Sequence, residues 1–214
     1  MPGQDDPLQP FSKPVRPAEM SPAVVPEGMA FLARRHSVGP KFLASPAPTE
    51  AQWTAAAALA MRAPDHGGLR PFRFVIVGDG QRVALAELFA RDAEQRGRPD
   101  AEIEKARARA HHGPGLVALV GRVRDGVEGV PPTEQWVCIG AALMNFLNAL
   151  QGMGFGAKTL SGASVRAPAI GGAFCVPGET LVAWIVAGTP LRAPHPKAGA
   201  GAGAAPPISR WRPQ

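Results

Sequence analysis

Three stretches of the chain combine β-branched or aromatic residues with apolar runs, a pattern typical of strands. They lie at residues 72–77, 115–123 and 180–187, and the second and third are apolar enough to predict burial on both faces. Gly78-Asp79-Gly80 predicts a turn after the first strand. Residues 154–159 predict a turn that leads into a further short strand.

Helical patterns alternate with these strands. We expect helices at residues 27–35, 82–96, 100–110, 134–151 and 165–174, and one that opens near Thr49 and stops before Pro64. Thr49 is the expected N-cap, because Gln52 can complete a capping box. The buried sides expected for the 27–35 and 82–96 helices comprise Met29, Phe31 and Leu32, and Val83, Leu85, Leu88 and Phe89.

The helix at 134–151 is the longest apolar helix. Its apolar residues lie all round it, so neighbours must surround it, and a second subunit could be one of them. Trp53, Trp136 and Trp184 are expected mostly in the core, with the alternative that Trp136 lines a substrate site. The mixture of elements predicts an α/β or α+β fold with a central sheet flanked by helices.

Proline and glycine divide the chain into three parts. Residues 1–25 predict an extended proline-rich leader, residues 26–193 the folded domain, and residues 194–214 a Gly/Ala/Pro linker that ends in a docking segment around Ile208 and Trp211. The sequence has no apolar run long enough for a membrane span, and no secretory signal. We therefore expect no membrane partner.

Cysteine content and net charge bear on the cellular compartment and on the possible binding partners. Cys138 and Cys175 are expected to be buried, inert thiols in a reducing compartment, which indicates the cytoplasm. The net charge of +6 fits a solvated basic surface, with phosphate or nucleic-acid binding as alternatives. Few aromatic residues lie among the arginines, so we expect no nucleic-acid partner. The adjacent His111 and His112 are expected to be loop residues rather than metal ligands.

Two clusters carry candidate chemistry, although the sequence has no nucleophile elbow and no Walker A loop. Arg34-Arg35-His36-Ser37 could bind a phosphate, or could simply follow a helix end. The loop at 61–72 presents Arg62 and His66 among glycines and prolines, or is only a turn. Gly152-Met153-Gly154 follows a helix instead of a strand, which argues against a dinucleotide loop.

In this order the motifs resemble the nitroreductase family, in particular its small members. The resemblance covers roughly residues 31–190. The matching segments are Arg35-His36-Ser37, Pro46-Ala47-Pro48-Thr49, Met61-Arg62-Ala63-Pro64-Asp65-His66, Glu134-Gln135 with Gly140-Ala141-Ala142, Gly152-Met153-Gly154-Phe155-Gly156 leading to Ser161-Gly162, and Gly188-Thr189-Pro190.

The resemblance implies an α+β fold with a mostly antiparallel sheet and an intertwined homodimer that holds FMN at the subunit interface. It also implies ping-pong transfer of hydride from NADPH or NADH, through the flavin, to a nitroaromatic, quinone or related acceptor. No protein residue is then needed for the hydride chemistry. A flavin-binding member without general reductase activity is the first alternative, and a basic nucleic-acid-binding protein the second.

The family's functional positions carry over to particular residues of this chain. Arg35, His36 and Ser37 would hold the FMN phosphate and ribityl chain, with help from Arg34. Arg62 and His66 would contact FMN across the interface. The other flavin contacts implied are Thr159, Leu160, Ser161 and Arg192. The sequence departs from the family pattern at Arg70, Phe72 and Leu160, which bears on substrate range and flavin affinity.

Overall fold

The protein is described by a computed structural model over residues 26–191 and 208–211. The chain divides into two units, residues 1–33 and 34–214. In the first unit the described element is α1 (Glu27–Ala33), which has no buried residue. The expected buried side of this helix is therefore wrong: Met29 and Leu32 are exposed and Phe31 is half-buried. A seven-residue helix offers no surface of its own on which to bury such a face.

The second unit is built on an antiparallel sheet. Its strands are β1 (Leu43–Ala44), β2 (Phe72–Val77), β3 (Gly115–Gly121), β4 (Gly156–Leu160) and β5 (Thr180–Pro190). β5 pairs with β3 along one edge, and with β4 and β1 along the other, while β2 pairs with β3. All these pairings are antiparallel, which confirms the predicted α+β class.

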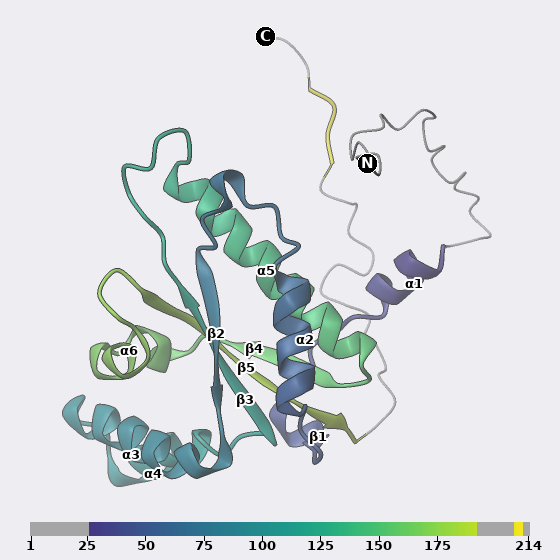
Figure 1. The fold of residues 1–214 in the computed structure, drawn as a ribbon. Coiled ribbons are helices and arrows are strands. Elements are labelled where there is room, and N and C mark those ends of the chain that lie inside the picture. Colours follow the sequence, from purple (N-terminus) through teal and green to yellow (C-terminus); the bar gives the residue numbers. More distant parts are fainter. Residues whose placement is uncertain (1–25, 192–207, 212–214) are drawn as a thin grey trace, which may run out of the picture. The chain divides into compact units, whose positions relative to one another are not determined.

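Helices cover both faces of the sheet (Figure 1). α2 (Glu50–Ala60) and α5 (Pro132–Gly152) lie on one face, and α3 (Asp79–Gln95), α4 (Asp100–Arg109) and α6 (Pro168–Phe174) lie on the other. Short 3₁₀ turns connect these elements at η1 (Pro40–Phe42), η2 (His66–Gly68) and η3 (Ala163–Arg166). No helix among the described residues is long and apolar enough to cross a membrane.

Successive side chains of β3 and β5 point to opposite faces of the sheet, and this alternation produces two hydrophobic cores. Val117 and Leu119 join the core beneath α2 and α5, whereas Leu116 and Ala118 join the core beneath α3 and α4. Every residue of β3 is buried, as its continuous apolar sequence predicts. The centre of the sheet is thus covered on both faces, whereas the edge strand β2 keeps Ile76 exposed.

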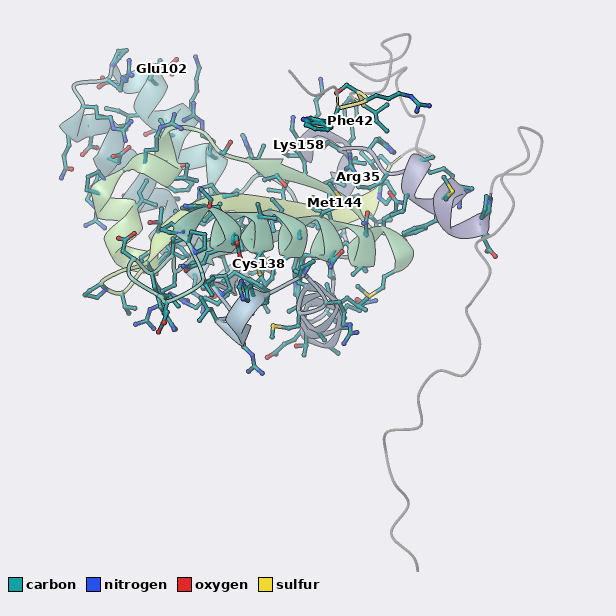
Figure 2. The ribbon with its side chains drawn as sticks, turned by 90° about the horizontal axis from the view of Figure 1, so that it is seen from above. Arg35, Phe42, Glu102, Cys138, Met144 and Lys158 are labelled. Carbon is teal, nitrogen blue, oxygen red and sulfur yellow. The ribbon has the colours of Figure 1, made fainter. Side chains whose placement is uncertain are left out.

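A three-ring stack fixes α5 in its position. The Phe146 ring of α5 stacks on Phe74 of β2 at 4.1 Å and on Trp53 of α2 at 5.8 Å, with interplanar angles of 14° and 9°. Phe146 is fully buried, so the stack adds to the apolar burial of the helix. Figure 2 shows Cys138 and Met144 on opposite sides of α5. The Cys138 side is buried, and the other side leaves Val137 and Met144 exposed in the single chain.

Local signals in the sequence set most element boundaries. The capping box is confirmed: the Gln52 backbone N–H donates to Thr49 Oγ1 at 3.3 Å, and the Thr49 N–H donates to Gln52 Oε1 at 2.9 Å. The predicted turn at Gly78-Asp79-Gly80 is wrong, because α3 begins at Asp79 with extended Gly78 as its N-cap. An acidic side chain in the first turn favours a helix there.

Two further expectations are corrected on the α3 side of the sheet. Val83 is 64% exposed, so of the four residues expected on the buried side of α3 only Leu85 and Phe89 are buried, and Leu88 is half-buried. The expected 165–174 helix is split into η3 and α6, because Pro168 opens a new helix at its first position.

An ion pair ties the start of β5 to β2. Glu179 accepts hydrogen bonds from Arg73 Nε at 2.9 Å and Nη2 at 2.6 Å, and Arg73 also donates to the Phe174 carbonyl. The Glu179 side chain is 6% exposed. The hydrogen bonds from Arg73 lower the pKa of Glu179 from 4.5 to about 2. This carboxylate therefore favours the folded state above about pH 4.5, and its contribution fades as the pH falls toward about 2.

We predict that Glu179→Gln lowers the free energy of unfolding at pH 7 by about 1–2 kcal/mol. The loss is no larger because Arg73 is partly exposed to water, which weakens its ion pair with Glu179. Urea titrations should show a smaller difference from the wild type at pH 3 than at pH 7. Glu94→Gln, at an exposed position of α3, is the matched control and should have little effect. An equal loss at both pH values would contradict this account.

Candidate functional site

The predicted phosphate segment lies against the first residues of β4. The Val38 backbone N–H donates to the Ala157 carbonyl at 3.0 Å, which fixes the chain just after Ser37. Arg35 and His36 are half-buried, while Arg34 and Ser37 are exposed. His36 Nδ1 lies 3.1 Å from the Arg34 carbonyl oxygen, a contact that restrains the imidazole.

Arg35 and His36 line a cavity of about 240 Å³. Its remaining walls come from the end of α5, the turn into β4 and the end of β5, namely Val38, Leu147, Gln151, Gly154, Phe155, Gly156, Ala157 and Pro190. Gly156 has no room for a side chain, because a Cβ there would lie 2.9 Å from Leu43 Cδ2 and 3.0 Å from Val38 Cβ. This close approach holds the cationic segment against β4. The structure therefore places Arg35 and His36 at one small cavity whose other walls are mostly apolar.

The predicted flavin-contact strand carries an unusual buried hydroxyl. Thr159 Oγ1 in β4 is buried and has no hydrogen-bond partner among the described residues, and the same is true of Asn148 Oδ1 in α5. Leaving such an atom unpaired costs about 1–3 kcal/mol. An unpaired buried hydroxyl at Thr159 therefore favours a polar group from outside the described chain, at a residue for which the family resemblance implies a flavin contact. Asn148 was missed by the sequence reasoning; the signal available was an amide within an apolar helix.

The two residues after Thr159 face different surroundings. Leu160 packs against the core beneath α3 and α4, so its side chain has a structural role in this chain. Ser161 is exposed and lines an open groove of about 810 Å³, together with Trp136, Val165 and Arg166. Trp136 is 43% exposed and lines this groove, so the expectation that it lies in the core is wrong. Trp53 and Trp184 are buried as expected.

The second predicted cluster is a rigid loop between α2 and β2. The Asp65 carboxylate accepts hydrogen bonds from the Leu69 N–H at 3.1 Å and the Arg70 N–H at 2.8 Å. These bonds hold Arg70 at a φ of 48°, a left-handed conformation that costs a non-glycine residue about 1–2 kcal/mol. The departure from the family pattern at Arg70 therefore falls on a strained position.

His66 is held by a residue from the start of α5. His66 Nδ1 lies 2.8 Å from Glu134 Oε2, and the two side chains are 62% and 50% exposed. Arg62 is also exposed. The contact between Glu134 and His66 links two motifs 68 residues apart.

The single chain does not unite the predicted site residues in one cavity. The cavity at Arg35 and His36 is lined by neither Arg62 nor His66, and Thr159, Leu160 and Ser161 lie outside its walls. Arg192 lies outside the described residues. The predicted residues thus form three separate surfaces in this chain.

The possible metal-ion ligands and the two cysteines among the described residues also bear on the chemistry of the site. Within this part of the chain there is no group of three or more His, Cys, Asp and Glu side chains that could hold a metal ion. Both cysteines are free thiols. Burial raises the pKa of Cys138 and of Cys175, which disfavours the reactive thiolate.

Comparison with known proteins finds relatives in sequence and in fold. The protein of Escherichia coli K12 named "Putative NAD(P)H nitroreductase YdjA" is 32% identical over 149 residues, which span 69% of this chain and 81% of that protein. A nitroreductase-like family protein from Bacillus cereus has a TM-score of 0.64 at 19% identity, covering 92% of this chain and 100% of that one.

A second solved structure shares the fold. A point mutant of the FMN and NADPH-dependent nitroreductase NfnB from Sphigopyxis sp. strain HMH has a TM-score of 0.61 at 17% identity, and the match covers 84% of this chain and 98% of that one. The model of the Nitroreductase family matches residues 32–189, which include both candidate clusters and β4. The chain therefore belongs to the nitroreductase family.

Proposed function

We propose that the protein is an FMN-dependent oxidoreductase that uses NADPH or NADH. The observation that carries the proposal is the cavity lined by Arg35 and His36 beside β4. A guanidinium and an imidazole at a small cavity suit the phosphate of a mononucleotide. The relatives named as NAD(P)H nitroreductases and as FMN and NADPH-dependent support the same cofactor pair.

The residues present fit the proposed cofactor. Arg35, His36 and Ser37, with Arg34 beside them, would hold the phosphate and ribityl chain. Thr159 Oγ1, buried without a partner in the described chain, would pair with a polar atom of the ring system, and Ser161 would donate a further hydrogen bond. We propose Arg192 as an additional cation for the phosphate. When bound, FMN supplies the redox chemistry by accepting hydride from NAD(P)H and passing electrons in a ping-pong cycle to a nitroaromatic, quinone or related acceptor.

The protein's own task is then to bind and orient the flavin and the substrates, and to exclude water from the site. The Asp65 hydrogen bonds fix the loop that carries His66, and Glu134 fixes the His66 ring. We propose that Arg62 and His66 act across a subunit interface on the partner's flavin. This assignment explains why they lie outside the Arg35 cavity of their own chain. Two free thiols and a reduced nicotinamide substrate fit a cytoplasmic location.

The exposed face of α5 favours a homodimer. Val137 is 68% exposed and Met144 45% exposed, on the side of α5 opposite the aromatic stack. Such apolar side chains on the outer face of an otherwise buried central helix favour an isologous contact with a second copy. We propose that this face is the core of the dimer.

The proposed function predicts a yellow protein. Purified protein should absorb between about 350 and 500 nm, and anaerobic NADPH or NADH should bleach that band because the flavin accepts the hydride. Adding a quinone or nitroaromatic should restore the band. Bound flavin that no nicotinamide reduces would instead favour a flavin-binding protein without reductase activity. A colourless protein that FMN cannot reconstitute would overturn the proposal.

Arg35→Ala should weaken FMN binding by about 10- to 100-fold, because it removes a charge-assisted contact to the phosphate. Fluorescence titration of the flavin-free protein with FMN measures the change. Arg91→Ala, at an exposed position of α3, is the matched control and should bind as the wild type does. Riboflavin, which lacks the phosphate, should bind both variants equally. Unchanged FMN affinity in Arg35→Ala would show that Arg35 does not contact the FMN phosphate.

Val137→Glu should convert the dimer to a monomer, because it places a charge at the centre of the proposed interface. Light scattering should give twice the chain mass of 22.3 kDa for the wild type and the single-chain mass for the variant. Val83→Glu is the control, since Val83 is 64% exposed on α3. If both variants stay dimeric, the interface lies elsewhere.

A further inference from the structure

A second cavity lies between the α3–α4 hairpin and the segment that follows β4. It encloses about 260 Å³ and is lined by Phe89, Asp92, Ala93, Arg96, Arg98, Glu102, Ala106, Arg109, Ala163, Ser164 and Ile170. Neither the predicted flavin contacts nor the proposed dimer face includes any of these residues. Figure 2 shows Glu102, in the wall of this cavity, at the far side of the molecule from Arg35.

The floor of the cavity is apolar. Phe89, Ala93, Ala106 and Ile170 are all buried, with exposed fractions of 7% or less. A ligand must therefore bring an apolar body to this surface. The volume is below the range of about 300–1,000 Å³ typical of drug-sized ligands, which restricts the occupant to a small molecule and excludes a dinucleotide.

The polar groups of the rim are unequally paired. Asp92 pairs with Arg96 at 3.1 Å, and Glu102 pairs with Lys105 at 2.7 Å. Arg98 and Arg109, by contrast, have no ion pair with any carboxylate in the described part of the chain. Both lie near enough to Glu102 to lower its pKa, after the larger effect of the Lys105 hydrogen bond. Two guanidiniums therefore remain available to an anion.

The main chain holds Arg98 in place. Gly97 ends the α3 helix at a φ of 65°, and the Arg98 N–H donates to the Ala93 carbonyl at 3.1 Å, as in a Schellman motif. Pro99 follows as the N-cap of α4. This short connection fixes where the Arg98 side chain starts, so less freedom is lost when a ligand binds.

Ser164 adds a third donor. Its Oγ accepts a hydrogen bond from Trp184 Nε1 at 3.0 Å. Because that bond occupies the oxygen as an acceptor, the hydroxyl proton remains to be donated into the cavity. The cavity thus presents donors from Arg98, Arg109 and Ser164, while both of its carboxylates already have cationic partners.

We infer that this cavity binds a small organic carboxylate with an apolar body, such as an aromatic acid. The carboxylate would accept hydrogen bonds from Arg98, Arg109 and Ser164, and the ring would lie on Phe89, Ala106 and Ile170. A single negative charge suits the site better than a phosphate dianion, because the carboxylates of Asp92 and Glu102 are also in the wall. The inference does not depend on the proposed flavin chemistry.

Calorimetric titration with benzoate tests the inference, with benzamide as the uncharged probe of the same shape. Benzoate should bind the full-length protein at least tenfold more tightly than benzamide, and the combined Arg98→Ala and Arg109→Ala variant should lose at least tenfold in benzoate affinity. Replacing both arginines by lysine should retain part of that affinity. Arg91→Ala is the control and should bind as the wild type does.

Other results would overturn the inference. Equal binding of benzoate and benzamide would show that no cation recognises the carboxylate. Unchanged benzoate affinity in the double alanine variant would exclude this cavity, and loss of benzoate binding in Arg35→Ala alone would place the acid at the phosphate segment instead. None of these binding measurements requires bound flavin. A colourless protein would therefore overturn the proposed flavin-dependent function, while the carboxylate-binding inference could still be tested.

Discussion

The packing of α5 is the constraint on which the rest of the structure depends. The stack of Phe146 between Trp53 and Phe74 clamps this helix between α2 and the sheet. Both ends of α5 then carry parts of the candidate site. Its start holds Glu134 against His66, and its end leads through Gly154 into β4, where Thr159 and the Arg35 cavity lie. Shifting the helix would displace all three surfaces together.

The same helix supports the proposal that each site needs two chains. Its inner side is buried in the core that it shares with α2, whereas Val137 and Met144 remain exposed on its outer side. The site residues are divided in a matching way, because Arg35 and His36 share a cavity that Arg62 and His66 do not reach. A dimer formed through the outer side of α5 would address both features, since a second copy could cover the apolar side chains and supply the missing half of a site.

The sequence predicted the core of this arrangement well, because its signals there are local. The continuous apolar run of β3 and the Thr49 capping box each depend on neighbouring residues. The sequence-based predictions were wrong where contacts between distant parts of the chain determine whether a side chain is buried. Val83 follows the helical pattern of α3 but is exposed, and Met29 and Leu32 of α1 are exposed as well. The contact between His66 and Glu134 joins residues 68 positions apart, and no local pattern predicts it.

The central claim is that each flavin site takes residues from two chains, and a subunit-mixing experiment tests it most directly. Arg35→Ala chains and chains carrying both Arg62→Ala and His66→Ala should each retain little FMN as homodimers. After unfolding and refolding together, the mixture should bind FMN at about a quarter of its sites, because half of the dimers are mixed and each of these has one intact site. If mixing restores no FMN binding, all of these residues act within one chain and the shared site is contradicted.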